Sequence, residues 1–157
     1  MPTLQLKLAP PQPADRLASL AGRLTDLSTR ILGKRREVTA VVVEELWPGR
    51  WFIGGRQVSD ATALLVIRVT QGTNSAEEKQ AFVEAAYEAL SQELGPLHEA
   101  SYVVVQEVPA GDWGYGGRRR RKERHLPSSP RRRGSRALKT AAGRPLSGSS
   151  GFPPSRE

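Results

Sequence analysis

The sequence contains no cysteine and only two histidines among its 157 residues. Without cysteine there is no disulfide framework, no thiolate nucleophile and no cysteine-based metal site. His98 and His125 are isolated and form no ligand cluster, so we expect no metal and no other cofactor. No apolar run approaches the length of a transmembrane helix, and the N-terminus lacks the pattern of a secretion signal. We therefore expect a soluble, cytoplasmic protein without a membrane contact.

Acidic residues are scarce in the last quarter of the chain. Residues 118–157 hold 13 Lys/Arg against 2 Asp/Glu, whereas residues 1–117 hold 11 Lys/Arg against 14 Asp/Glu. The net charge of +8 therefore belongs to residues 118–157. This segment has few large apolar residues and much Ser, Pro, Gly and Arg, a composition that predicts a disordered basic tail. Its arginine runs at 118–121 and 131–133 would suit nonspecific binding to nucleic-acid phosphates.

What the sequence does have is one pattern used twice, 62 residues apart. The recurring features are Leu32-Gly33 and Leu94-Gly95, Val41-Val42-Val43 and Val103-Val104-Val105, Glu45 and Glu107, Gly49 and Gly111, Trp51 and Trp113, and Gly54-Gly55 and Gly116-Gly117. Self-similarity at a fixed interval indicates one supersecondary unit that occurs twice. We place the first unit, with its Gly-aromatic arm, at residues 1–60 and the second at 61–117.

The first unit reads as strand, helix, strand and arm. Alternating leucines from Leu4 to Leu8 predict a half-buried strand. A helix follows, because apolar residues recur at steps of three and four at Leu17, Leu20, Leu24, Leu27 and Ile31. Gly33 is placed to form a left-handed cap at its end. Residues 38–45 are almost continuously apolar, which predicts a strand in the interior of a sheet, and residues 47–55 predict a small hairpin.

The second unit repeats this order. Residues 65–69 alternate as a strand, and Ser75 with Glu78 forms a capping-box pattern. The helix that follows carries Val83, Tyr87, Leu90 and Leu94, and residues 102–107 form the last strand. Two β-α-β units predict an α/β fold (α+β by some schemes), a four-stranded sheet with both helices on one face. The other face keeps apolar strand residues, so we expect an oligomer that buries it.

A strand that starts at Pro2, a helix, an apolar strand and the arm Gly49-Arg50-Trp51-Phe52-Ile53-Gly54-Gly55 together resemble the 4-oxalocrotonate tautomerase superfamily. The doubled unit is similar to the fused members of that superfamily. The resemblance spans residues 2–117 and implies a homotrimer with a pseudo-sixfold arrangement. It also implies that the catalytic group is Pro2, exposed as an amino-terminal proline once Met1 is removed.

The chemistry of a terminal proline fits this role. The group is a secondary amine held rigidly by its ring, and the reference pKa of an α-amino group lies near 8. Desolvation and nearby cations both lower such a pKa toward the range in which a general base works best. We expect Pro2 to act as general base in keto–enol proton transfer on a small 2-keto or enol carboxylic acid. An alternative keeps Pro2 protonated as general acid for dehalogenation, hydration or decarboxylation of a three-carbon acid.

Other site residues follow from the resemblance and from where the sequence departs from it. Arginines that the family uses for substrate carboxylates are absent, because their positions are occupied by Gln12, Ala40, Thr73 and Tyr102. We expect Tyr102 and Arg50 to contact the substrate instead. Trp51 and Trp113 match the aromatic residue of the pocket, and each either lines it or anchors a subunit interface. A third hypothesis is a non-catalytic trimeric scaffold with a nucleic-acid-binding tail.

Overall fold

The computed structural model describes residues 1–119. The first unit comprises β1 (Thr3–Ala9), α1 (Ala14–Leu32), a 3-10 turn η1 (Arg36–Val38), β2 (Ala40–Glu45) and the hairpin of β3 (Phe52–Ile53) and β4 (Arg56–Gln57). The second comprises β5 (Thr62–Thr70), α2 (Ala76–Leu94), β6 (Tyr102–Val108), a 3-10 turn η2 (Ala110–Asp112) and the hairpin of β7 (Gly114–Tyr115) and β8 (Arg118–Arg119). From the first helix onward, each helix and strand of the first unit begins 62 residues before its counterpart.

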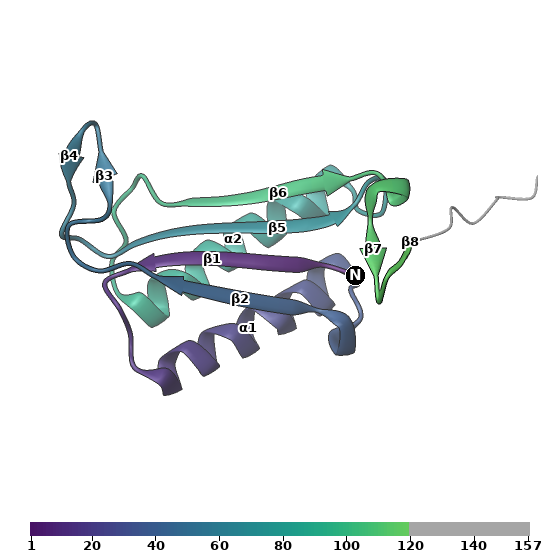
Figure 1. Cartoon of the computed structure of the whole chain (residues 1–157), viewed down its shortest axis with the longest axis horizontal. Helices are drawn as coiled ribbons and strands as arrows, with labels where there is room; N and C mark the ends of the chain where they lie inside the picture. Colours follow the sequence, from purple (N-terminus) through teal and green to yellow (C-terminus); the bar gives the residue numbers. More distant parts are fainter. Residues whose placement is uncertain (120–157) are drawn as a thin grey trace, which may run out of the picture. The chain divides into compact units, whose positions relative to one another are not determined.

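The four long strands form one mixed sheet in the order β2-β1-β5-β6. Each outer strand runs parallel to the inner strand of its own unit, and the two inner strands are antiparallel. Both helices lie side by side on one face of the sheet, and the two hairpins stand at its opposite ends (Figure 1). The structure thus confirms the predicted α/β architecture of two tandem β-α-β units. Within residues 1–119, neither helix is long and apolar enough to cross a membrane.

The core lies between the helices and the sheet. The predicted alternation is confirmed in both inner strands, whose buried residues are Leu4, Leu6, Leu8, Leu65, Ile67 and Val69. In α1 the predicted stripe supplies Leu20, Leu24 and Leu27. The buried face of α2 differs from the predicted one, because it consists of Phe82, Ala86, Ala89 and Leu90, while Val83 and Tyr87 are only half-buried. Alanines carry a weak hydrophobic signal, so the periodicity of the larger residues misplaced this face.

Local signals at two helix ends are confirmed. Gly33 ends α1 in the left-handed conformation with φ of 62°, and its N–H donates to the carbonyl of Ser28. Ser75 caps the start of α2 with both bonds of the capping box. Its hydroxyl accepts a hydrogen bond from the Glu78 N–H, and the Glu78 carboxylate accepts one from the Ser75 N–H. These ends matter because the loops beside them form the candidate site.

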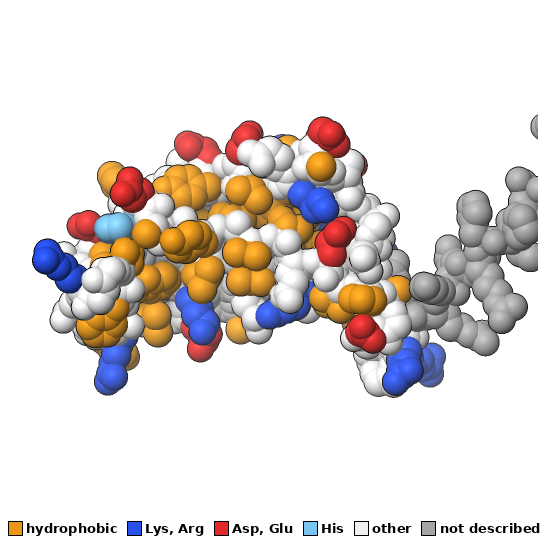
Figure 2. Space-filling view, turned by 90° about the horizontal axis from the view of Figure 1, so that it is seen from above, with side chains coloured by type: hydrophobic (Ala, Val, Ile, Leu, Met, Phe, Trp, Pro, Cys, Tyr) orange, Lys and Arg blue, Asp and Glu red, His pale blue; other side chains and the backbone are white. Residues whose placement is uncertain are grey.

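The face of the sheet opposite the helices is uncovered in the single chain. The strand registers place three rows of side chains across it, and the middle row consists of Val42, Gln5, Val66 and Val104. Val42, Val104 and Tyr102 keep 56%, 42% and 57% of their surface exposed. Figure 2, which views the molecule from its β6 side, shows hydrophobic side chains gathered along this edge. An apolar face of this kind fits the predicted oligomer.

Two predictions are wrong, one on the place of a strand in the sheet and one on the start of the tail. Residues 38–45 were expected to lie inside the sheet, but β2 is an edge strand. Its near-continuous valines arise because Val41 and Val43 pack on the core while Val42 lies on the uncovered face. The disordered tail was expected to start at residue 118, but Arg118 and Arg119 pair with Tyr115 and Gly114 in a hairpin. The rest of the predicted tail lies outside the described residues.

Candidate active site

Pro2 lies at the start of the inner strand β1 and is almost fully buried, with less than 2% of its surface exposed. Its carbonyl oxygen accepts a hydrogen bond of 3.3 Å from the N–H of Ala40, which fixes it against the edge strand β2. The N-terminus lies at the end of the sheet where the hairpin β7–β8 stands (Figure 1). Although Pro2 is next to the chain end, its position is fixed by the pairing of β1 with β2.

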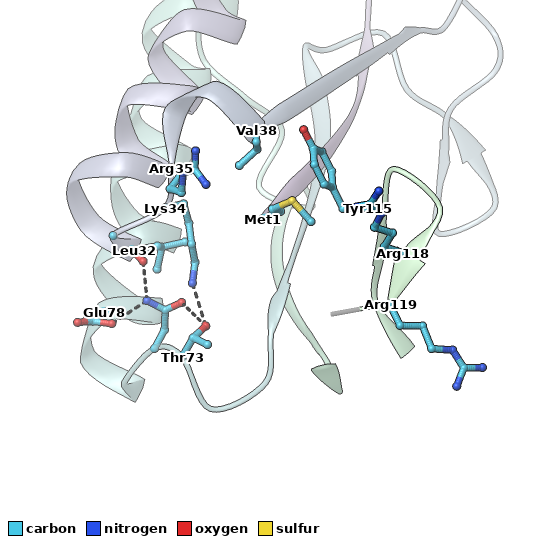
Figure 3. A pocket seen from close by; sticks show the side chains of 12 residues that line it. Met1, Leu32, Lys34, Arg35, Val38, Thr73, Glu78, Tyr115, Arg118 and Arg119 are labelled. Carbon is cyan, nitrogen blue, oxygen red and sulfur yellow. Dashed lines mark hydrogen bonds between the residues drawn. The ribbon is translucent and has the colours of Figure 1, made fainter. Parts of the chain in front are cut away.

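A pocket of about 630 Å³ opens beside Met1, the residue directly before Pro2. Three segments from different parts of the chain build its walls: the end of α1 with the loop after it, the loop before α2, and the second hairpin. The lining residues are Met1, Leu32, Gly33, Lys34, Arg35, Val38, Thr73, Asn74, Glu78, Tyr115, Arg118 and Arg119. In Figure 3 the ring of Tyr115 extends from the hairpin toward Met1 and Val38. Met1, which is bonded to the Pro2 nitrogen, therefore forms part of the pocket wall.

A network of hydrogen bonds joins two of these walls. The side-chain nitrogen of Asn74 donates to the carbonyl of Leu32 at 2.9 Å and to Glu78 Oε2 at 2.8 Å. Lys34 Nζ donates to Thr73 Oγ1 at 2.9 Å (Figure 3). The hydrogen bond from Asn74, followed by that from the Ser75 N–H, lowers the pKa of Glu78 below its ordinary value. Glu78 therefore stays ionised and is engaged with the protein backbone and Asn74.

The pocket is rich in positive charge. Among the described residues, Lys34, Arg35, Arg118 and Arg119 line it together with a single carboxylate, that of Glu78. Residues 1–119 as a whole carry 13 Lys/Arg against 14 Asp/Glu, so the surplus of cations is local. Cations gathered in a concave site attract a negatively charged ligand. With Leu32, Val38 and Tyr115 as apolar walls, the arrangement suits a small organic anion. Among residues 1–119, no three His, Asp or Glu side chains group closely enough to hold a metal ion.

The predicted site residues fall into two groups at opposite ends of the sheet. Arg50, Trp51 and Tyr102 line a second hollow of about 390 Å³, whose other walls are Lys7, Leu46, Phe52 and Leu64. It lies near the far end of the seven-residue strand β1, about 20 Å from Pro2. A single chain does not bring these three residues to Pro2.

Trp113 lies at the same end of the sheet as Pro2, just before β7. It is buried, with 9% of its surface exposed, and it does not line the pocket beside Met1. Its indole N–H has no hydrogen-bond acceptor among the described residues. Tyr115, two residues further along, is the aromatic residue that reaches the pocket.

Sequence reasoning missed the cations of the pocket. In the sequence, Lys34 and Arg35 are indistinguishable from cations that complement the dipole at a helix end, and Arg118 and Arg119 were assigned to the tail. One signal could have found Arg118: Gly54-Gly55-Arg56 in the first arm recurs as Gly116-Gly117-Arg118 in the second. The repeat therefore extends past the predicted boundary.

Comparison with known proteins agrees with this architecture. A family model described as tautomerase enzyme matches residues 2–61 and again 64–122. The chain belongs to the tautomerase family. Its two matches correspond to the two β-α-β units, which confirms the resemblance to fused superfamily members. No curated protein sequence matches the chain.

Solved structures share the fold of this tautomerase-family chain. A fused 4-OT described as a wild-type asymmetric trimer is 23% identical, with a TM-score of 0.69, and the alignment covers 74% of this chain and 94% of that one. Pt0534 inactivated by 2-oxo-3-pentynoate is 17% identical, with a TM-score of 0.67 and coverages of 73% and 92%. N1, a member of the cis-3-chloroacrylic acid dehalogenase family, is 21% identical, with a TM-score of 0.68 and coverages of 76% and 84%.

Proposed function

We propose that this chain is an enzyme that uses Pro2, freed by removal of Met1, as general base for keto–enol proton transfer on a small 2-keto or enol acid. The observation that carries the proposal is the burial of Pro2 beside a cation-lined pocket of about 630 Å³. The family match supports the same class of chemistry. The Pro2 nitrogen would take a proton from the carbon next to the substrate carbonyl and return it to another atom of the same molecule.

The surroundings of Pro2 favour a base over an acid. Burial and the charges of Lys34, Arg35, Arg118 and Arg119 would all disfavour a positively charged amine at Pro2. Glu78 opposes this effect, but its carboxylate already accepts hydrogen bonds from Asn74 and Ser75. A neutral amine is the form that a general base requires.

We also propose that the chain acts as a homotrimer. The uncovered sheet face supports this assembly, as does the trimer described for the similar fused 4-OT. Assembly through that face would place the hollow with Arg50, Trp51 and Tyr102 of one protomer near another protomer. Those residues would then contribute to a site that a single chain leaves incomplete.

The test is turnover of phenylpyruvate and 2-hydroxymuconate by the protein with its native N-terminus, first shown by mass spectrometry to lack Met1. Pro2→Ala should abolish nearly all proton transfer, whereas Pro96→Ala, at an exposed proline, should leave it intact. Equal turnover by wild type and Pro2→Ala, or a retained Met1, would refute the proposal. A rate that rises as the pH falls through the amine pKa would indicate the general-acid alternative, since a base must be deprotonated.

A further inference from the structure

The second hairpin presents its two arginines to different sides. Tyr115 and Arg118 are directly paired in the β7–β8 register, as are Gly114 and Arg119. Directly paired residues of antiparallel strands share one face of the ladder, and successive residues alternate between faces. Because the ring of Tyr115 extends toward Met1, Arg118 lies on the face turned to the pocket. Arg119 lies on the other face, and its side chain extends away from Met1 in Figure 3.

The hairpin holds this arrangement rigidly. Gly116 and Gly117 form the two-residue turn with φ of 56° and 74°, the left-handed conformations that a tight hairpin turn requires. A side chain other than that of glycine is strained in this conformation, so the turn fixes the register that sets Tyr115 opposite Arg118.

Arg118 is also less engaged with other side chains than Lys34 and Arg35 are. Lys34 is bonded to Thr73, and Arg35 lies 3.7 Å from the carboxylate of Glu37. Within residues 1–119, no carboxylate lies at ion-pair distance from Arg118. The guanidinium of arginine matches the geometry of a carboxylate with two parallel hydrogen bonds.

We propose that Arg118 binds the carboxylate of a small 2-keto or enol acid beside Pro2. It would take the place of the arginines absent at Gln12, Ala40, Thr73 and Tyr102, and it comes from the second hairpin rather than from a strand or the loop after β1. This inference rests on the proposed function of Pro2. Tyr115 and Val38 form the apolar wall against the rest of the substrate, and Lys34 adds attraction from the wall at the end of α1.

The test uses covalent labelling of Pro2 by two alkynyl ketones that differ only in charge: 2-oxo-3-pentynoate, an acid, and 3-pentyn-2-one, in which a methyl group replaces the carboxylate. The neutral Pro2 nitrogen adds to the alkyne carbon remote from the ketone. A C–N bond forms, one alkyne π bond breaks, and the proton of the resulting ammonium moves to the adjacent carbon. The protein therefore gains the mass of one whole reagent molecule. Rates are measured by mass spectrometry at about pH 9, above the reference pKa of an α-amino group near 8, so that differences in amine protonation between variants contribute little.

Arg118→Ala should slow labelling by the acid about 5- to 10-fold, the low end for a charged hydrogen bond because Arg118 is exposed. It should leave labelling by the neutral ketone within about twofold, since that reagent has no carboxylate to bind. Arg30→Ala removes the same charge from an exposed position on α1 outside the pocket and should change the acid's rate less than about twofold. Arg118→Lys should restore part of the lost rate.

Equal slowing by Arg118→Ala and Arg30→Ala would overturn the inference, because it would indicate attraction by net charge rather than a contact. Unchanged labelling by the acid in Arg118→Ala would also overturn it. In both cases the wild-type protein would still be labelled at Pro2, and the proposed function would stand. If neither reagent labels wild-type Pro2, the proposed function fails, and this inference fails with it.

Discussion

Placing a charge on the uncovered sheet face tests the proposed assembly. Val104 lies on the edge strand β6, in register with Val66 at the middle of that face. It is 42% exposed in the single chain, so an aspartate there reaches water as long as the chain is alone. We predict that Val104→Asp folds but no longer forms the trimer. The cost to the isolated fold should be about 1 kcal/mol or less, the range of strand propensities.

The exposed fractions give the size of the effect on assembly. Complete burial of a valine is worth about 1.5–3 kcal/mol, so the exposed parts of Val42 and Val104 correspond to about 1 kcal/mol each. Tyr102, 57% exposed, would bury about 110 Å², or about 3 kcal/mol. These three residues therefore offer about 5 kcal/mol per protomer. An unpaired carboxylate buried in each copy costs several kcal/mol, enough to cancel this gain.

Sedimentation velocity over a range of concentrations measures the assembly, and circular dichroism measures the fold. Wild type should sediment as a trimer and Val104→Asp as a folded monomer. Ala18→Asp, at an exposed position on α1, is the matched control and should remain trimeric. A trimeric Val104→Asp, or a wild type that is monomeric at high concentration, would show that this face is not the interface.

Three further predictions concern stability. Hydrogen bonds from Arg23 and then Ser19 lower the pKa of Glu93, so its contribution is present above the unfolded pKa and lost as the pH falls through the folded one. Glu93→Gln should thus cost about 0.5–1 kcal/mol in urea unfolding at pH 7 but almost nothing near pH 3. A cost that is equal at the two pH values would contradict this assignment. Ser75→Ala should remove the cap of α2 and cost about 1 kcal/mol in the same assay. An unchanged free energy of unfolding would show that α2 does not depend on this cap. Trp113→Phe should change the thermal midpoint little because its N–H has no acceptor among the described residues, whereas Trp113→Ala should cost about 3–5 kcal/mol; similar losses for both would mean that the N–H is bonded in the assembly.

Much of the fold could be predicted because the same pattern of strand, helix and strand occurs twice in the sequence. The leucines of β1 and the stripe of α1 carry strong periodic signals, and the interval of 62 residues transfers each assignment to the second unit. The buried face of α2 escaped because Ala86 and Ala89 stand where α1 has Leu24 and Leu27, at the same interval. The hydrophobic pattern within one unit predicts its helix. The packing of large residues of α1 against small residues of α2 depends on the sequences of both units together.

The site was harder to predict than the fold. Pro2 is a local feature, visible in the sequence as the residue before an alternating strand. The pocket beside it depends on three loops whose meeting is set by the antiparallel pairing of β1 with β5. That pairing brings the end of β6, and with it the second hairpin, to Pro2, while it sends the first hairpin with Arg50 and Trp51 to the other end. Because no spacing in the sequence reports which hairpin lies beside which strand, the residues of both ends were predicted as one site.

The two units differ in the residues that correspond to the cations of the pocket beside Met1. At the interval of 62 residues, Lys34 and Arg35 correspond to Pro96 and Leu97, and Arg119 corresponds to Gln57. The end without a free amine therefore lacks three of the four cations that line the pocket beside Met1. If these charges served only to cap a helix or to keep the protein in solution, both ends would benefit equally. The other end has its own cations, Lys7 and Arg50, but they lie on β1 and in the first arm and are not counterparts of these three. The two ends therefore differ in which elements carry their charge, as the proposal of a single site at Pro2 requires.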